Sequence, residues 1–239
     1  RDVAPSRGLG DVYKRQEVPG RWQYYGVSLP FWRSYDKEDP RREFFYYDYT
    51  GDAKRDDQSD YGFHYMVPEE GVTVVPNDTT KYMQNVATMK YTYDMISDAY
   101  YDGRTICIFR LSDVILCKAE IENNLNGPAA ALPYLNQIRA RAGAPEYGKH
   151  NRFPAPSTKE AMNDAILKER GYELVFEFQR RADLIRFGKY EEVVNAHLKK
   201  LGIAQPTNVT SSLRYFPYPL NDAQLNPNLA AENPSRLPK

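Results

Sequence analysis

The stretch RLSDVILCKAEIENNLNGPAAALPYLNQIRARAG, residues 110–143, decides the fold class. Apolar residues in its first half recur at helical spacing, and Ser112 or Asp113 can cap the start of that helix. Residues 126–128, Asn-Gly-Pro, end one helix and begin another, and Gly143 ends the second. Two helices joined by so short a turn are expected to pack as an antiparallel hairpin. The stripe of the first helix comprises Leu111, Val114, Ile115, Lys118, Ala119 and Glu122.

Further helices are predicted on the C-terminal side of this hairpin. Within the hairpin, Pro133 is compatible with the second helix only if it lies in the first turn. Residues 157–160, Ser-Thr-Lys-Glu, form a capping box that opens what we expect to be the longest helix. Residues 190–201 have amphipathic spacing and precede a glycine. The apolar stripe of the long helix comprises Ala161, Ala165, Ile166, Leu174, Val175 and Phe178.

The part of the chain before residue 110 has a different character. Residues 17–109 are rich in aromatic residues and are punctuated by Gly and Pro, which predicts long loops and small β elements on a ligand-facing side. Strands are expected at residues 44–50, ended by Gly-Asp, and at residues 72–75. We expect residues 17–109 and 110–239 to form one incomplete domain. Residues 1–16 show no helical or strand period and resemble translated adapter sequence, so we treat them as a non-native leader.

The composition argues against several classes of function. Lys plus Arg and Asp plus Glu each number 32, so there is no basic excess for nucleic acid or for an anionic membrane surface. No apolar run approaches the length of a membrane span, and no signal peptide is seen. Cys107 and Cys117 are interpreted as small buried apolar residues rather than a disulfide or metal pair. The histidines, His64, His150 and His197, lack ligand spacing, so no metal or cofactor is predicted.

Three glutamates recur at every fourth position and therefore share one helical face: Glu169, Glu173 and Glu177. A carboxylate pair could act as the acid and nucleophile of a glycosidase. Arginines follow close behind, however, and glutamates one turn apart near arginines are more typical of an ion-pair network. We interpret the glutamates as structural and assign no catalytic residue.

Aromatic residues cluster before residue 36, and we predict that they contact a sugar ligand. Pyranose rings present apolar C–H faces, which flat aromatic side chains can cover while nearby polar groups bond the hydroxyls. The alternative is that these aromatic residues belong to the core. The predicted stacking residues are Trp22, Tyr24, Tyr25, Phe31, Trp32 and Tyr35, and the predicted hydrogen-bonding residues are Arg21 and Gln23.

Several ordered motifs resemble those of the SusD/RagB family, over roughly residues 27–235. The family has Gly where this chain has Phe178, and Gly at that position would allow a positive φ. Other departures are Gly171 in place of Arg and Asp113 in place of Glu. The matching segments are residues 39–41 (DPR), 110–120 (RLSDVILCKAE), 135–143 (LNQIRARAG), 166–177 (ILKERGYELVFE), 180–188 (RRADLIRFG), 216–219 (FPYP) and 226–234 (NPNLAAENP).

This resemblance implies a mainly α fold of tetratricopeptide-like helix pairs with long loops and small β elements, truncated here to its C-terminal half. It implies a non-catalytic glycan-binding lipoprotein of the outer membrane, facing outward, that delivers its ligand to a TonB-dependent, SusC-like transporter. On this resemblance, the protein is expected to contact the membrane only through a lipid anchor, in an N-terminal part that this sequence lacks. A peptide-binding receptor on the same scaffold and a helical-repeat scaffold for a partner protein remain the alternatives.

Overall fold

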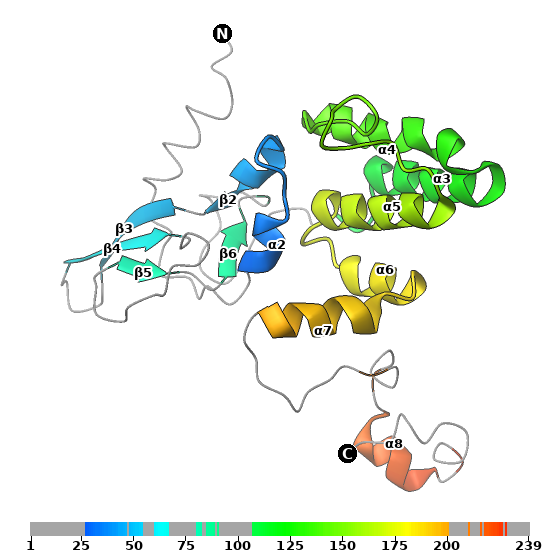
Figure 1. Ribbon diagram of the computed structural model, residues 1–239. Helices are drawn as coiled ribbons and strands as arrows, with labels where there is room; N and C mark the ends of the chain where they lie inside the picture. Colours follow the sequence, from blue (N-terminus) through cyan, green and yellow to red (C-terminus); the bar gives the residue numbers. More distant parts are fainter. Residues whose placement is uncertain are drawn as a thin grey trace. The chain divides into compact units, whose positions relative to one another are not determined.

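The structure is a computed structural model that describes residues 27–46, 48–54, 60–66, 80–82, 85–88, 90, 107–200, 210, 216, 218–226 and 228. The chain divides into two compact units, Arg1–Glu177 and Phe178–Lys239. The described residues are mainly helical, as predicted (Figure 1). Both sides of the predicted boundary at residue 110 lie in the first unit, and the division of the chain into residues 17–109 and 110–239 stays a prediction.

The first unit contains the helical hairpin that the sequence predicted. Helix α3 (Leu111–Asn126) and helix α4 (Pro128–Ala142) are separated only by Gly127, whose φ of 89° suits a residue without a Cβ. Both helices pack against each other and against helix α5 (Lys159–Glu173) (Figure 1). Helix α4 ends at Gly143 with a φ of 71°, so both predicted stop signals are confirmed.

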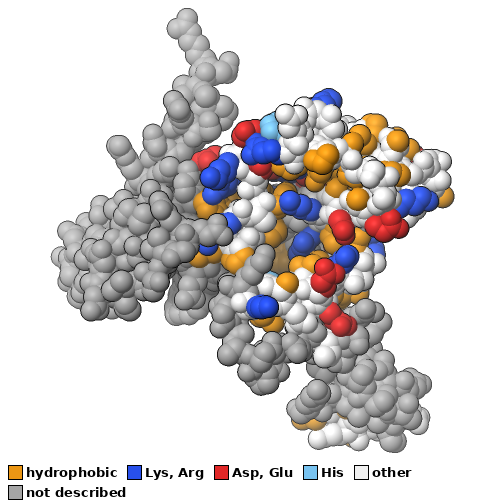
Figure 2. All heavy atoms as spheres, in the orientation of Figure 1, with side chains coloured by type: hydrophobic (Ala, Val, Ile, Leu, Met, Phe, Trp, Pro, Cys, Tyr) orange, Lys and Arg blue, Asp and Glu red, His pale blue; other side chains and the backbone are white. Residues whose placement is uncertain are grey.

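The buried face of α3 differs from the predicted stripe. Leu111 and Val114 are 72% and 62% exposed, and hydrophobic side chains are visible over α3 and α4 in Figure 2. Ala119 is buried as predicted, and beside it the buried side carries Leu116 and polar residues such as Asp113 and Glu120. These carboxylates turn inward because Arg170 of α5 lies within ion-pair distance of both, at 2.7 and 3.8 Å. The helix also has no side-chain cap, contrary to the expectation for Ser112 or Asp113, because its N-cap residue is Arg110.

Pro133 lies inside helix α4, beyond its first turn, so the predicted restriction on its position is wrong. The ring removes one N–H donor from the helix interior, which costs roughly 3 kcal/mol. The helix persists because its buried face packs completely: Ala131 and Leu135 are 0% exposed and Ile138 is 1% exposed. Tertiary packing therefore outweighs the local preference.

Helix α5 begins where the sequence predicted and ends earlier. Its N-cap is Thr158, whose hydroxyl accepts a hydrogen bond from the N–H of Ala161 at 3.1 Å. It ends at Glu173, so Val175 and Phe178 lie beyond the helix. The expectation that α5 is the longest helix is wrong, because α3 has 16 residues and α5 has 15. Phe178 is 85% exposed rather than buried.

Two small sheets lie in the first unit. The first has strand order β1-β6-β2 and is antiparallel; its strands are β1 (Val27–Ser28), β2 (Phe45–Tyr46) and β6 (Asn85–Thr88). The second has order β3-β4-β5; β3 (Asp48–Lys54) pairs antiparallel with β4 (Asp60–Met66), which pairs parallel with β5 (Thr80–Tyr82). Strand β3 continues through Gly51 and Asp52, where a strand end was predicted. The predicted strand at residues 72–75 lies outside the described residues.

An aromatic core fixes the first sheet to helix α5. It joins residues of α2 (Leu29–Arg33), the strands and α5: Val27, Trp32, Tyr35, Phe45, Val86 and Tyr172. Since Tyr172 comes from the last turn of α5, this core holds the segment around residues 27–46 against the helical layers.

The second unit contains α6 (Arg180–Arg186), α7 (Tyr190–Lys200) and α8 (Leu220–Leu225). Helices α6 and α7 pack together, and Arg181 lies 5.5 Å from the ring centre of Tyr190. The amphipathic helix predicted at residues 190–201 is thus confirmed to within one residue. Cys107 and Cys117, in the first unit, are free thiols and only half-buried, so the prediction that both are buried is wrong.

Candidate functional site

The segment Asp39-Pro40-Arg41 opens a 3-10 helix, η1 (Pro40–Phe44). Asp39 caps this helix: its carboxylate accepts a hydrogen bond from the N–H of Arg41 at 3.0 Å. The Arg41 guanidinium bonds the same carboxylate and reaches helix α5, where it pairs with Glu169 at 2.7 Å and Glu173 at 3.0 Å. Asp39 and Arg41 are 2% and 8% exposed, so this is a buried ionic junction.

The three glutamates of the predicted stripe are all buried and all paired. Arg139 bonds Glu169 at 2.7 Å, and Arg110 bonds Glu173 and Glu177 at 2.6 and 2.8 Å. These pairs agree with the structural interpretation, but the arginines come from other segments and not from the residues that follow the stripe. The predicted shared helical face is wrong for Glu177, because α5 ends at Glu173. Glu173 also pairs with Arg141, and Glu177 with Lys90.

Charge partners decide the ionisation of this cluster. Burial by itself raises the pKa of Glu173, but the hydrogen bond and charge of Arg110, with the charge of Arg141, hold that pKa below its ordinary value. Burial also lowers the pKa of Lys90, against the effect of Glu177. The arginine partners therefore hold Glu173 as a carboxylate, which is not free to act as a general acid.

Tyr35 and Tyr172 stack beside this junction, with ring centres 4.2 Å apart. The hydroxyl of Tyr35 donates to the carbonyl of Tyr172 at 3.1 Å, and the hydroxyl of Tyr172 donates to the carbonyl of Ser34. Burial raises the pKa of Tyr172 to about 12, so its hydroxyl keeps its proton. The loop of residues 34–39 is thereby fixed on the end of α5.

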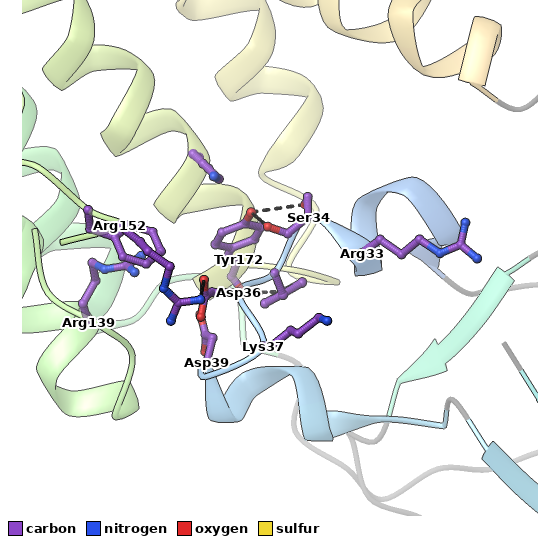
Figure 3. Close-up of a pocket in the computed structure, with 11 residues that line it drawn as sticks. Arg33, Ser34, Asp36, Lys37, Asp39, Arg139, Arg152 and Tyr172 are labelled. Carbon is purple, nitrogen blue, oxygen red and sulfur yellow. Dashed lines mark hydrogen bonds and ion pairs between the residues drawn. The ribbon is translucent and has the colours of Figure 1, made fainter. Parts of the chain in front are cut away.

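A cavity of about 470 Å³ opens between this loop, α4, α5 and the loop that connects them. Figure 3 shows Arg139 and Arg152 on one side and Lys37 on the other, with Tyr172 and Asp36 between them. This volume lies in the range of small-molecule sites, roughly 300–1,000 Å³. The lining residues are Arg33, Ser34, Tyr35, Asp36, Lys37, Asp39, Arg139, Arg152, Phe153, Lys168 and Tyr172.

Hydrogen-bonding groups and one half-buried ring stand at the mouth of this cavity. Ser34, Lys37, Arg152 and Lys168 are exposed, and the aromatic ring of Phe153 is half-buried. The cavity therefore offers many polar contacts and a limited apolar surface, which suits a hydroxyl-rich ligand better than an apolar one.

A second cavity, of about 340 Å³, lies on the other side of Tyr35 and Tyr172. Its charged lining consists of Arg41, Lys90, Arg110, Arg141 and Glu173, which belong to the ion-pair cluster described above. Because those charges are already compensated, this cavity offers a ligand few free polar groups. The first cavity is the stronger candidate for a binding site.

The structure places the described members of the predicted stacking cluster in or near the core. Trp32 and Tyr35 are 6% and 2% exposed, and Phe31 is half-buried against the same core. The guanidinium of Arg42 lies 4.1 Å from the ring centre of Trp32 and covers it. Burial thus favours the core interpretation for Trp32 and Tyr35, of which only Tyr35 lines the cavity. Arg21, Trp22, Gln23, Tyr24 and Tyr25 lie outside the described residues, and their assignment stays a prediction.

Several cavity residues were not singled out from the sequence. Lys37 stands two positions before the Asp-Pro-Arg motif, and Lys168 and Tyr172 lie inside the motif at residues 166–177. The motifs therefore marked the neighbourhood of the cavity. Nothing in the sequence pattern shows that Arg152 and Phe153, from a loop between helices, meet them there.

Comparison with known proteins gives the following relatives. The sequence model described as the SusD family matches residues 13–235. A SusD-like protein of Formosa agariphila is 39% identical over 120 residues, which cover 50% of this chain and 22% of that protein. The starch-binding protein SusD of Bacteroides thetaiotaomicron is 28% identical over 137 residues, covering 56% of this chain and 22% of that protein. The chain thus spans less than a quarter of either relative.

Two solved structures are similar in part. A SusD superfamily protein from Bacteroides vulgatus is 29% identical, with a TM-score of 0.40, over 50% of this chain and 25% of its own. A SusD superfamily protein from Bacteroides fragilis is 23% identical, with a TM-score of 0.42, over 77% of this chain and 33% of its own. Among the described residues, no helix combines the length and apolar character that a membrane crossing needs.

Proposed function

The chain belongs to the SusD family, and from this premise we propose that it takes part in nutrient uptake by binding a glycan without cleaving it. The observation that carries the proposal is the cavity formed by residues 34–39, α4 and α5. Its exposed hydroxyl, amine and guanidinium groups can bond sugar hydroxyls, and the half-buried ring of Phe153 can contact a C–H face. The relative named a starch-binding protein supports a glycan over other nutrients.

The proposal includes the absence of catalysis. The carboxylates that the sequence offered as glycosidase candidates are Glu169, Glu173 and Glu177, which are 1%, 3% and 3% exposed. Each is paired with arginine or lysine, so none is available as a general acid or as a nucleophile. Incubation with oligosaccharides should therefore release no reducing ends, and hydrolysis that disappears in Glu173→Gln would establish the opposite.

The binding proposal is tested by isothermal titration with neutral oligosaccharides, acidic oligosaccharides and oligopeptides. We expect heat of binding from at least one saccharide class and none from the peptides. Phe153→Leu should weaken saccharide binding, since it removes the ring and keeps apolar volume. Tyr134→Leu also removes an aromatic ring from α4, but at a residue that does not line the cavity, and should leave binding unchanged. Peptide binding with no saccharide binding would replace this proposal with the peptide-receptor alternative.

We further propose that the complete protein is lipid-anchored on the outward-facing side of the outer membrane and passes its ligand to a TonB-dependent, SusC-like transporter. The family assignment supports this cellular role. Protease treatment of intact cells should remove the protein, and affinity purification from solubilised membranes should recover a transporter of that class. A protein that resists the protease and purifies alone would argue against this location and this partner.

A further inference from the structure

We infer that the cavity selects saccharides that carry carboxylate or sulfate groups. This inference rests on the proposed function and narrows it to one class of ligand. It starts from the charges on the cavity wall, where five cationic residues face two carboxylates. The cations are Arg33, Lys37, Arg139, Arg152 and Lys168, and the carboxylates are Asp36 and Asp39.

Ion pairs compensate part of this charge. Arg139 is held by Glu169 at 2.7 Å, and Asp39 is held by Arg41 at 2.8 Å. Arg152 pairs with Asp36 at 3.1 Å and with Glu38 at 2.7 Å. These pairs account for both lining carboxylates and leave the lysines of the wall uncompensated.

Lys37 and Lys168 carry the excess. Neither has an ion pair within the part of the chain that the structure describes, and both are exposed at the cavity. The ammonium group of Lys168 lies 5.8 Å from the ring centre of Tyr172, which places it over the cavity wall. The two lysines come from different elements, the loop after α2 and helix α5, so the fold brings them to one concavity.

This local excess is not a reflection of the whole molecule. The chain has 32 basic and 32 acidic residues, so a positive cavity stands against a neutral average. The second cavity has cations that are compensated by Glu173 and Glu177, which shows that this fold does neutralise charges where they are structural. Two free ammonium groups at a polar concavity therefore point to an anionic partner, whose attraction the low-dielectric walls strengthen.

The test is isothermal titration of the whole chain with four probes of matched length or charge. They are an oligogalacturonate, a sulfated galactan oligosaccharide without uronic acid, a neutral malto-oligosaccharide and inorganic sulfate. The double variant Lys37→Gln/Lys168→Gln removes the two free charges. The matched control is Lys118→Gln/Lys159→Gln, which makes the same change in net charge at exposed lysines that do not line the cavity. Circular dichroism verifies that both variants are folded.

At least one acidic oligosaccharide is expected to bind about ten-fold or more tightly than the neutral one, since one favourable charge contact of about 1.4 kcal/mol has that effect. The cavity variant should lose this preference and the control should keep it. Added salt should lower the affinity for the acidic oligosaccharide and leave that for the neutral one unchanged, because salt screens exposed charges. Comparison of the two acidic probes shows whether carboxylate or sulfate is preferred.

Three results overturn the inference. One is equal affinity for neutral and acidic saccharides, which leaves the proposed glycan function intact. Another is inorganic sulfate binding as tightly as the oligosaccharides, which makes the site a simple anion site. The last is an acidic preference that survives in Lys37→Gln/Lys168→Gln. Failure of every saccharide, with binding of peptides, would instead remove the proposed function itself.

Discussion

Nη1 of Arg41 donates a hydrogen bond to Oε1 of Glu169 at 2.7 Å, although 128 positions separate the two residues in the sequence. Both side chains are buried, and the bond ties the 3-10 helix η1 to helix α5. The loop that carries Lys37 leads directly into η1. The geometry of the proposed binding cavity therefore depends on this buried contact.

Replacement of Arg41 by Gln is expected to lower the free energy of unfolding by about 3–5 kcal/mol, because it leaves buried carboxylates without their partner. The measurement is urea unfolding followed by circular dichroism. Arg152→Gln is the matched control: the Arg152 side chain is 46% exposed where it pairs with Asp36 and Glu38, and pairs of exposed side chains contribute about 1 kcal/mol or less. Equal losses of unfolding free energy in the two variants would show that the buried junction stabilises the fold no more than the pairs of Arg152 do.

Stability is expected to fall in acid through Glu173. Its pKa in the folded protein is below the ordinary value of 4.5, so folding favours the ionised form. The resulting stabilisation is complete above pH 4.5 and is lost as the pH falls through the lower folded-state pKa. Carbon NMR of the glutamate carboxyl groups should show a titration displaced to low pH that is absent from Glu173→Gln. A spectrum with every glutamate near its ordinary pKa contradicts this expectation.

Replacement of Phe178 by Gly is expected to stabilise the protein, by roughly 1 kcal/mol or less. Phe178 has a φ of 62°, a strained value for a residue with a Cβ, and its side chain is 85% exposed, so little packing is lost. Phe109→Gly is the control. Phe109 is 74% exposed and its φ is not positive, so this change should destabilise the protein slightly. Thermal unfolding compares the two, and a lower Tm for Phe178→Gly would count against backbone strain.

Pro133→Ala is expected to stabilise helix α4 by about 2 kcal/mol, because it restores an interior N–H donor and removes a ring from the helix. Pro128→Ala is the control, since Pro128 occupies the first turn, where its missing N–H has no helical partner in any case. Unfolding in urea should separate the two variants. If Pro133→Ala gains nothing, the helix has adapted to its proline.

Three helix ends could be predicted because local chemistry determines them, whereas the cap of α3 and the end of α5 were predicted wrongly. Gly127 and Gly143 adopt the positive φ that their residue type permits, and Thr158 supplies a side-chain cap. The buried face of α3 could not be predicted, because Arg170, from another helix, draws Asp113 inward. Apolar spacing assumes that only apolar residues are buried, and a buried ion pair violates that assumption.

The surroundings of the aromatic residues were harder to predict than the helices. Aromatic residues near polar ones fit both a sugar platform and a core, and for Trp32 and Tyr35 the structure shows the core. The cavity instead combines residues from distant segments, such as Lys37, Arg152 and Lys168, whose proximity only the tertiary structure reveals. Several motifs of the resemblance include residues of the buried ion pairs, among them Arg41, Arg110 and Glu169.

The central claim is that a saccharide binds in the cavity between residues 34–39 and helix α5. The most direct measurement is a two-dimensional amide NMR titration of the labelled protein with the oligosaccharide that binds best in calorimetry. We predict that the largest shift changes map to Lys37, Arg152, Phe153 and Lys168, with a saturation curve that matches the calorimetric affinity. Shift changes confined to residues that do not line this cavity, with the signals of these four residues unchanged, would contradict saccharide binding in the cavity.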